Sequence, residues 1–415
     1  MKNNFNNYLF FLLFVSFQFT SCAQQQKSSV KKATTLNDQI KVGADRINLY
    51  ISKLKGKNIA IVANQTSVLN VSQRAEVAPN IMGIKLVQHH LVDYLHNNYG
   101  VKVQKVFAPE HGFRGKADAG ETVIDGIDKK TNLPIVSLYG KNKKPSPEQL
   151  QNIDVVVFDI QDVGARFYTY ISTLHYVMEA CTEAKIPIIV LDRPNPNGHY
   201  IDGPLLEPEH KSFVGMHPVP VVYGMTIGEY GQMINGEKWL KNGIQCDLTV
   251  IPLKNYTHES KYGLPIKPSP NLPNETSINL YPSLCFFEGT TVSAGRGTDK
   301  QFQIYGAPYL SENDFSFTPK SNEGAKHPKY KNKVCYGENL EESKYLNSLD
   351  LSWLIKAYKQ STKKDFFNSF FTKLAGTKKL QQQIENGVSE KEIKNSWKKD
   401  VSAFKKVREK YLMYK

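Results

Sequence analysis

The chain has few cysteines for its length, five in 415 residues, and no Cys-x-x-Cys pair occurs among them. This spacing excludes the usual ligand pattern of a structural zinc site and a dithiol redox motif. Cys181 lies in an amphipathic helical pattern and Cys285 in an apolar run, so we expect buried free thiols. One disulfide bond among Cys181, Cys246, Cys285 and Cys335 remains an alternative.

Nucleotide-binding fingerprints are also absent. No Gly-x-Gly-x-x-Gly and no Gly-x-x-x-x-Gly-Lys-Ser/Thr follows any predicted strand, which disfavours dinucleotide cofactors and P-loop phosphate binding. The histidines show neither His-x-His nor His-Glu-x-x-His spacing. The sequence therefore gives little support to a metal-dependent hydrolase in which His111 and Asp159, Asp162 or Asp192 would hold the metal. We expect no metal ion or cofactor.

The formal net charge of +14 comes mostly from lysine. Interleaved aromatic and basic runs, helix-turn-helix patterns and zinc-finger spacings are missing, so nucleic acid is not an expected partner. An anionic polymer or a membrane surface accounts better for the excess positive charge.

The N-terminus is typical of a bacterial lipoprotein signal. Lys2 precedes an apolar stretch from Tyr8 to Phe19, and small residues follow before Cys22. We therefore expect a signal peptide over 1–21, lipidation of Cys22, and a flexible tether over 22–37. The expected location is the cell envelope, facing the periplasm. An ordinary secretory signal is the alternative, and the stretch is too short for a convincing permanent membrane span.

Strand and helix patterns alternate over 38–202. Apolar strands are predicted at 58–64, 101–107, 134–138, 154–160 and 186–192, and helices at 89–97 and 173–184 and from Ser146, where a capping box begins. Continuous apolar strands separated by helices indicate a parallel sheet covered on both faces. The sequence thus predicts an α/β domain with a Rossmann-like, doubly wound parallel sheet.

Proline and glycine punctuate the chain after residue 202. A short strand is predicted at 218–223, a helix from Thr226 to Trp239, a strand at 246–252, and a lysine-rich amphipathic helix at 389–411. The composition therefore changes at about residue 202, and we place a domain boundary at 202/203.

Polar side chains follow four of the predicted strands. Because the carboxyl ends of parallel strands form the ligand crevice of open α/β sheets, these side chains predict a site at one edge. They are Asn64, Gln65 and Thr66 after the first strand, Glu110 and His111 after the second, Asp159, Asp162 and Arg166 after the fourth, and Asp192, Arg193 and Asn195 after the fifth.

Two short strings concentrate ionisable groups. Phe107 to Gly115 carries an acid, an imidazole and Arg114 directly after a strand, and 285–298 holds Glu288 and Arg296 among glycines. For the first string, a surface turn with Glu110 salt-bridged to Arg114 is the structural alternative.

Seven ordered strings carry a resemblance that covers the chain from about residue 38 to its end. APEHGFRG, FDIQDVGARFYTY, LDRPNPNG, VYGMTIGEY, SPNLP, FFEGTTVSAGRGT and the ending from Ser396 to Tyr414 are similar to the NamZ-type exo-β-N-acetylmuramidase family, formerly of unknown function. The resemblance implies a glycoside hydrolase that releases N-acetylmuramic acid from non-reducing ends of peptidoglycan fragments. It also implies that a smaller α+β C-terminal domain over 203–415 packs on the Rossmann-like domain and contributes to the active-site cleft between them. A catalytically silent, lipid-anchored peptidoglycan-binding protein is the alternative of a different class.

Glycoside hydrolysis generally uses two carboxyl groups, one protonated and one ionised. Glu110 is our choice for the general acid, because a loop enclosed by apolar side chains would desolvate it and favour its protonated form. Glu288 and Glu229 are the candidates for the second carboxylate, although a capping box with Thr226 would also explain Glu229. Asp159, Asp162 and Asp192 compete for this role.

Muramic acid carries a lactyl carboxylate, which a guanidinium would recognise. Arg296 and Arg166 are the first candidates and Arg114 and Arg193 the reserves, and a structural ion pair is the alternative for each. The remaining predicted substrate-binding residues are His111, Tyr168, Asn195, Asn271 and Ser293. For them a packed histidine, a core aromatic or a turn cap is the alternative.

Overall fold

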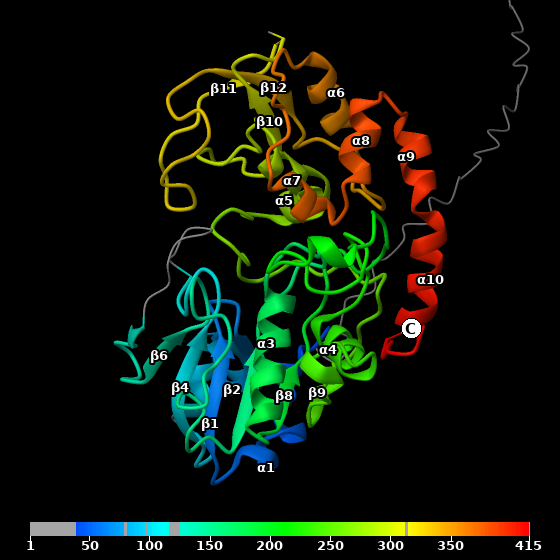
Figure 1. The fold of residues 1–415 in the computed structure, drawn as a ribbon. Helices are drawn as coiled ribbons and strands as arrows, with labels where there is room; N and C mark the ends of the chain where they lie inside the picture. The colour runs from blue at the N-terminus through cyan, green and yellow to red at the C-terminus, as the bar shows by residue number, and fades with distance from the viewer. Residues whose placement is uncertain (1–38, 79–80, 97, 116–124, 312–313, 415) are drawn as a thin grey trace, which may run out of the picture. The chain divides into compact units, whose positions relative to one another are not determined.

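The computed structural model describes residues 39–78, 81–96, 98–115, 125–311 and 314–414 (Figure 1). Residues Ile40–Lys415 form one compact unit. The predictions for 1–37, including lipidation of Cys22, lie outside the described residues.

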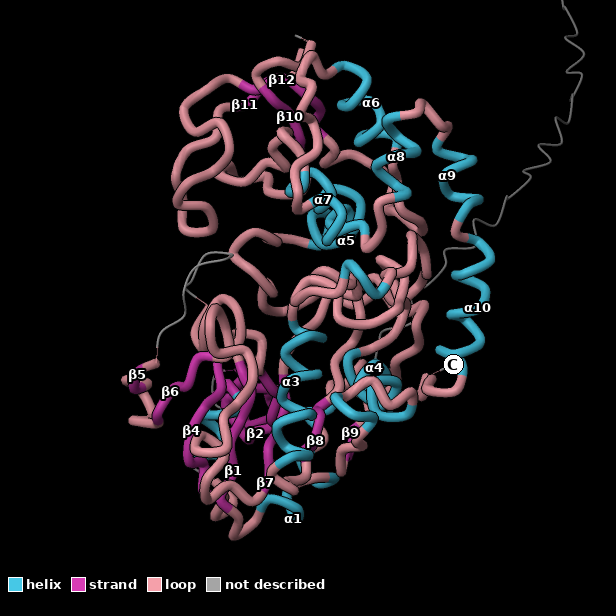
Figure 2. Tube along the Cα trace, viewed as in Figure 1, coloured by secondary structure: helices cyan, strands magenta, loops and turns pink. Residues whose placement is uncertain are grey.

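A seven-stranded sheet with the order β5-β6-β4-β1-β7-β8-β9 forms the first part of the unit (Figure 2). All neighbouring strands are parallel except β5, which runs antiparallel to β6 at one edge. In chain order the parallel strands read 3-2-1-4-5-6, the order of a Rossmann sheet. Their bounds are β1 Asn58–Ala63, β4 Lys102–Ala108, β5 Gly126–Ile127, β6 Pro134–Ser137, β7 Val155–Asp159, β8 Ile188–Leu191 and β9 Leu248–Ile251.

Both faces of the sheet are buried. Ala60 and Val62 of β1 pack into the core beneath α3 (Tyr170–Glu183) and α4 (Ile227–Gly236), which lie against one face in Figure 1. The alternate residues Ile59 and Ile61 belong to a second core with α1 (Ile51–Leu54) and α2 (Leu91–His96). Because strand side chains alternate in direction, nearly every residue of these strands must be apolar, and the predicted doubly wound fold is confirmed.

The structure differs from the elements predicted from local sequence patterns at several places. A hairpin of β2 (Val68–Ala78) and β3 (Ile81–His90) was not predicted, and β3 shortens the helix expected at 89–97. Ser146 and Gln149 form both capping-box hydrogen bonds, but only turns follow because no helix propagates there. The strand expected at 218–223 is reduced to isolated bridges of Val222.

The C-terminal part is α+β, as predicted. Its antiparallel sheet has the order β10-β12-β11, and the helix expected at 389–411 is interrupted at Trp397. The strands are β10 Ile304–Ala307, β11 Ser316–Phe317 and β12 Cys335–Asn339; the helices are α5 Glu275–Leu284, α6 Ser352–Gln360, α7 Phe371–Ala375, α8 Lys379–Glu385, α9 Glu390–Ser396 and α10 Lys398–Glu409. Short 3₁₀ helices lie at η1 Gly43–Asp45, η2 Ile47–Leu49, η3 Pro208–His210, η4 Lys241–Gly243 and η5 Cys285–Gly289.

The predicted boundary at 202/203 does not coincide with the end of the first part. Strand β9 lies beyond it, yet it pairs with β8 through the crossover that contains α4. The sequence signal at 202 is a change in composition, whereas the sheet itself ends at Ile251.

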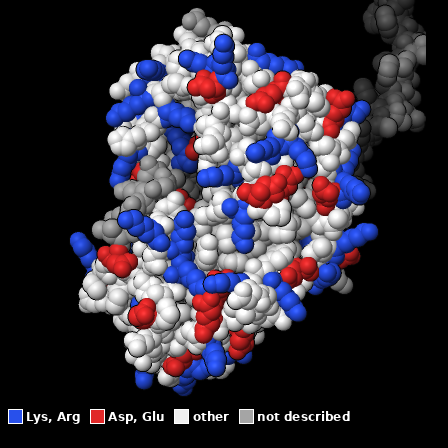
Figure 3. All heavy atoms as spheres, viewed as in Figure 1, with Lys and Arg blue, Asp and Glu red and all other residues white. Residues whose placement is uncertain are grey.

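Cys181, Cys246, Cys285 and Cys335 are buried free cysteines, which confirms the expectation of free thiols. Within the described residues, none of the helices combines the length and apolar composition that crossing a bilayer requires. Figure 3 shows lysine and arginine spread over one face with acidic residues among them, rather than gathered in a single stripe.

A buried histidine pair connects α3 to α4. His175 Nδ1 lies 2.9 Å from His217 Nε2, and His217 Nδ1 lies 3.0 Å from the hydroxyl of Tyr230. Burial lowers the pKa of His175 to about 4, although Glu179 opposes this shift, and burial also lowers the pKa of His217. Both rings are therefore neutral in the folded protein at neutral pH.

We expect this pair to make the fold sensitive to acid. An unfolded His175 binds its proton near pH 6.5 and the folded one near pH 4, so the free energy of unfolding falls as pH decreases through this window. His175→Gln should reduce the pH slope of the unfolding free energy by about 1 kcal/mol per pH unit between pH 5 and 6. Urea unfolding at several pH values measures the slope, and an unchanged slope in the variant would contradict the assignment.

Candidate active site

A cavity of about 650 Å³ opens where the sheet meets the C-terminal part. Its lining includes residues that follow β4, β6 and β7, together with residues from 269 to 329 and from α7. In a 3-2-1-4-5-6 sheet the connections reverse direction beside the first strand, and ligands bind at the carboxyl ends of the strands there. The strand order therefore predicts a ligand site at the position where the cavity lies.

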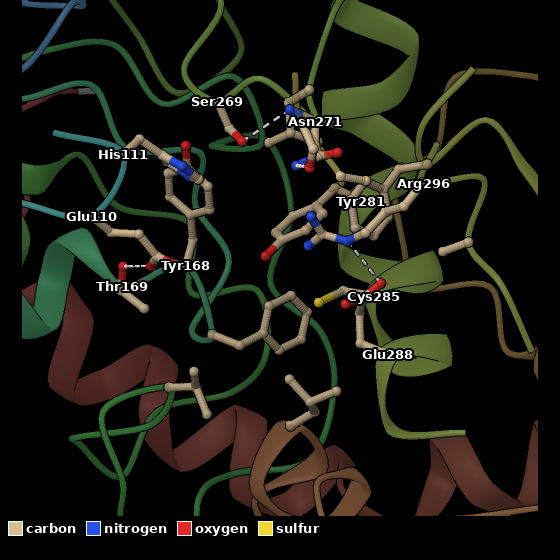
Figure 4. A pocket seen from close by; sticks show the side chains of 18 of the residues that line it. Glu110, His111, Tyr168, Thr169, Ser269, Asn271, Tyr281, Cys285, Glu288 and Arg296 are labelled. Carbon is tan, nitrogen blue, oxygen red and sulfur yellow. Dashed lines mark hydrogen bonds and ion pairs between the residues drawn. The ribbon is translucent and has the colours of Figure 1, made fainter. Parts of the chain in front are cut away.

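Glu110 forms one wall of the cavity and follows the end of β4 directly (Figure 4). His111 and Gly112 have positive φ angles of 70° and 75°, so the chain turns sharply after the carboxyl group. Thr169 Oγ1 donates a hydrogen bond to Glu110 Oε2 over 2.7 Å, and Thr169 is also the N-cap residue of α3. The hydroxyl at the N-terminus of a 14-residue helix therefore fixes the position of this carboxyl group.

Glu288 and Arg296 form the facing wall (Figure 4). Arg296 Nε donates to Glu288 Oε1 over 3.0 Å, while its terminal nitrogens point into the cavity. Burial lowers the pKa of Arg296 and the Glu288 carboxylate raises it, with a net upward shift, so the guanidinium stays charged. An arginine held through Nε keeps its two-nitrogen edge available for an anionic ligand.

Lys329 holds the loop that carries Glu288. Its Nζ donates to the carbonyl oxygens of Phe287, Thr290 and Val292 at 2.9, 2.7 and 3.2 Å. Burial lowers its pKa, but four carbonyl groups around one ammonium, including that of Glu288, favour the charged form. Lys329 thus fixes the backbone on both sides of Glu288 and adds positive charge to the cavity.

The segment 268–271 closes the cavity between the two walls. Tyr168 donates its hydroxyl to the carbonyl oxygen of Pro268 over 2.9 Å. Asn271 Nδ2 donates to the carbonyl oxygen of Gly324 over 2.6 Å, and a Cβ at position 324 would lie only 2.8 Å from Asn271 Oδ1. That buried Oδ1 has no hydrogen-bond partner among the described residues, so it is an acceptor ready for a ligand N–H or O–H group.

The structure brings seven of the predicted site residues to this cavity. They come from four loops that lie far apart in the sequence, which is why no single motif revealed the set. These residues are Glu110, His111, Tyr168, Asn271, Glu288, Ser293 and Arg296.

Glu229 does not line the cavity. Its side chain is fully buried and completes the capping box of α4 with Thr226, while His258 Nε2 lies 2.8 Å from its Oε2 and the backbone N–H of Met413 donates to its Oε1. The structural alternative for Glu229 therefore holds, and Glu288 is the candidate that remains on the cavity wall.

The buried aspartates also lie away from the lining. Asp159 forms a two-pronged ion pair with Arg193, at 2.6 and 2.8 Å. Asp192 accepts hydrogen bonds from Tyr414 and Thr226 at 2.6 and 2.8 Å, and from backbone N–H groups. These contacts support the ends of β7 and β8, because each group is paired or hydrogen-bonded inside the protein.

Asp162 and Asn195 have structural roles and do not line the cavity. Asp162 accepts from the hydroxyl of Tyr223 and from the N–H of Gly164, and burial raises its pKa to about 6. Asn195 caps its own turn through the N–H of Asn197 and donates to the carbonyl of Met225, which was the alternative for this residue.

Arg114 and Arg166 likewise serve the fold. Arg114 pairs with Asp93 at 2.9 Å and Asp128 at 2.7 Å rather than with Glu110. Arg166 is fully buried and donates to carbonyl oxygens of residues 204, 219, 374 and 375, so it links both parts of the unit. Neither guanidinium lines the cavity.

Several lining residues have no clear signal in the sequence. Thr169 lies within the string FDIQDVGARFYTY but was not singled out there, and Tyr281 lies shortly before another motif. Lys143 and Lys329 stand in lysine-rich stretches that resemble a solvated surface. Phe213 belongs to no motif at all. Only the contacts between distant segments of the folded chain distinguish these residues from their neighbours in the sequence.

The ligand set of the metal-dependent alternative is not assembled. His111 lines the cavity, but Asp159, Asp162 and Asp192 are engaged elsewhere. In the described part of the chain, one group of potential metal ligands comes within range, Glu207, Glu209 and His210, and it lies outside this cavity.

Comparisons with known proteins agree with the architecture. Residues 59–276 match the family model for the N-terminal part of the exo-beta-N-acetylmuramidase NamZ, and residues 279–414 match its C-terminal part. The curated peptidoglycan beta-N-acetylmuramidase NamZ of Bacillus subtilis (strain 168) is 38% identical over 95% of this chain and 96% of its own length.

Two crystal structures of DUF1343 family proteins from Bacteroides fragilis NCTC 9343 share the fold. One is 45% identical with a TM-score of 0.80 and the other 28% identical with a TM-score of 0.73, and each match covers 91% of this chain and 99% of the other. The sheet order, the cavity at its carboxyl edge and these full-length matches agree, and the chain belongs to the NamZ exo-β-N-acetylmuramidase family of glycoside hydrolases.

Proposed function

We propose that this enzyme releases N-acetylmuramic acid from the non-reducing ends of peptidoglycan fragments, with Glu110 as general acid and Glu288 as its partner carboxylate. The observation that supports this assignment is that these two carboxyl groups lie on facing walls of one cavity (Figure 4). A glycosidic bond between them could receive a proton from one side while the other side stabilises or attacks the anomeric carbon.

Different contacts position the two carboxyl groups. Glu288 is paired with Arg296, which holds its carboxylate on the wall that faces Glu110. Glu110 accepts a hydrogen bond from Thr169 at the N-terminal end of α3, which fixes its carboxyl group on the cavity wall, within reach of a leaving oxygen. Thr169 is thus a positioning residue for the acid.

Arg296 is the proposed partner of the lactyl carboxylate. It is the one predicted guanidinium that lines the cavity, and its terminal nitrogens face the open space (Figure 4). Lys329 adds a second positive charge nearby. Asn271 Oδ1, which lacks a partner among the described residues, suits the N–H of the acetamido group.

We also propose that Cys22 is lipidated and anchors the enzyme to a membrane of the cell envelope. The support is the sequence pattern of 1–22, and residues 23–37 would then connect the anchor to the compact unit, which begins at Ile40.

Replacing the two carboxyl groups should separate their roles. Glu110→Gln and Glu288→Gln should each lower hydrolysis of a muramic acid–glucosamine disaccharide by about 10²-fold or more. With a dinitrophenyl muramide, whose leaving group needs no proton, Glu110→Gln should recover most of its loss and Glu288→Gln should not. Steady-state release of free N-acetylmuramic acid measures both.

The matched control is Glu259→Gln, because Glu259 is exposed and lies outside the cavity; it should retain wild-type rates. Near-native turnover by Glu110→Gln would remove Glu110 from the mechanism. Absence of turnover by the wild-type chain at every pH would favour a binding protein, and loss in a chelator with recovery on adding zinc would favour the metal-dependent alternative.

Selectivity for muramic acid should depend on Arg296. Arg296→Gln should lower kcat/KM for a muramide by about 10- to 100-fold, the effect of one charged hydrogen bond, and should affect the matching glucosaminide less. The ratio of the two kcat/KM values is the readout, and Arg74→Gln, an exposed arginine of β2, is the control. An unchanged ratio would assign lactyl recognition to another residue.

Lipidation is tested in cells of a bacterium that processes lipoproteins. The wild-type chain should incorporate labelled fatty acid and sediment with membranes, whereas Cys22→Ala should do neither. Membrane association without label, or label in the variant, would contradict an anchor at Cys22.

A further inference from the structure

We propose that Phe213, Tyr139 and Lys143 form the subsite that binds the leaving-group sugar, an N-acetylglucosamine residue on the reducing side of the scissile bond. This proposal rests on the proposed function, because it uses Glu110 as the acid. The three side chains line the same cavity as Glu110.

Phe213 provides an aromatic surface that is fixed from behind. Tyr176 of α3 stacks on its ring with centroids 6.2 Å apart and an interplanar angle of 18°, and Tyr139 lies at 6.1 Å in a tilted arrangement. Ser172 Oγ donates to the carbonyl oxygen of Phe213 over 2.7 Å. Aromatic rings held in this way present a flat apolar face, which complements the C–H face of a pyranose ring.

Lys143 supplies a polar group that lies over this ring. Its Nζ lies 4.9 Å from the centroid of Phe213, and among the described residues it has no hydrogen bond or ion pair. The neighbouring Lys144 differs, because its Nζ is bound to Glu179 and Glu183 at 2.7 and 2.8 Å. Of the two adjacent lysines, only Lys143 combines a place in the cavity lining with an ammonium group available to a ligand.

One face of α3 aligns the aromatic surface with the acid. Thr169 binds Glu110, and Ser172 and Tyr176 hold Phe213. Positions i, i+3 and i+7 lie on the same side of a helix, so the acid and the aromatic ring are fixed by one rigid element.

The position of the general acid determines which sugar lies beside Phe213. A general acid gives its proton to the oxygen that joins the two sugars, so the leaving sugar must lie next to Glu110. The terminal sugar then extends toward Arg296 and Glu288 on the facing wall (Figure 4).

Burial agrees with this direction. Tyr139, Lys143 and Phe213 are half-buried. On the opposite side Asn271 and Phe302 are buried, while Glu288 and Arg296 are half-buried. An enzyme that removes a terminal sugar needs a closed end for that sugar and an open end for the remaining chain. The half-buried aromatic surface is suited to the open end.

The test compares substrates that differ only in the leaving group. Kinetics are measured on the muramic acid–glucosamine disaccharide and on the methyl β-muramide, for Phe213→Ala, Phe213→Leu and Lys143→Gln. The ratio of the two kcat/KM values should fall about 3- to 10-fold when the ring is removed, mostly through KM for the disaccharide, and by a smaller factor for Lys143→Gln.

Tyr99→Ala and Lys141→Gln are the matched controls, because both residues are exposed and lie outside the cavity, Lys141 only two residues from Lys143. Both variants should keep the wild-type ratio. Phe213→Leu keeps apolar volume, so it reports on the ring if Phe213→Ala fails to fold. A wild-type ratio in Phe213→Leu and Lys143→Gln overturns the subsite even when Glu110→Gln is inactive. An active Glu110→Gln variant would instead refute the proposed function, independently of these ratios.

Discussion

Every buried charge in this protein must be paired or hydrogen-bonded, and this constraint separates its structural ionisable residues from those available for chemistry. Asp159 and Arg193 neutralise each other inside the sheet edge, and Arg166 is surrounded by four carbonyl groups. Glu288 and Arg296 differ, because Arg296 is bound to Glu288 through Nε and its terminal nitrogens face the cavity. The same motifs therefore supply both the residues that support the site and the residues that line it.

Much of the fold could be predicted because it depends on local periodicity. The continuous apolar strands required two covered faces, and the carboxyl edge of a parallel sheet then located Glu110 and His111. The capping box at Ser146 shows the limit of such signals: its hydrogen bonds form, but capping alone does not extend a helix. Composition changes at the boundary predicted at 202, while the sheet continues to β9.

The composition of the site could be predicted only in part, because its contacts join distant segments. Arg166 looked like a ligand-binding arginine, and its acceptors lie up to 209 residues away in the chain. Glu229 could be judged from sequence because its capping partner is only three residues away. The roles of Lys143 and Phe213 could not be judged from the sequence. They depend on the fold, in which one side of α3 contacts both the Phe213 ring and the Glu110 carboxyl group.

The central claim is that one cavity holds muramic acid between the Glu110 wall and the Arg296 wall. A crystal structure of the Glu110→Gln variant with the muramic acid–glucosamine disaccharide tests it most directly. We expect the lactyl carboxylate to contact the terminal nitrogens of Arg296, and the glycosidic oxygen to lie within hydrogen-bond distance of the side chain at position 110. A disaccharide bound elsewhere, or with its carboxylate turned away from Arg296, would contradict the claim.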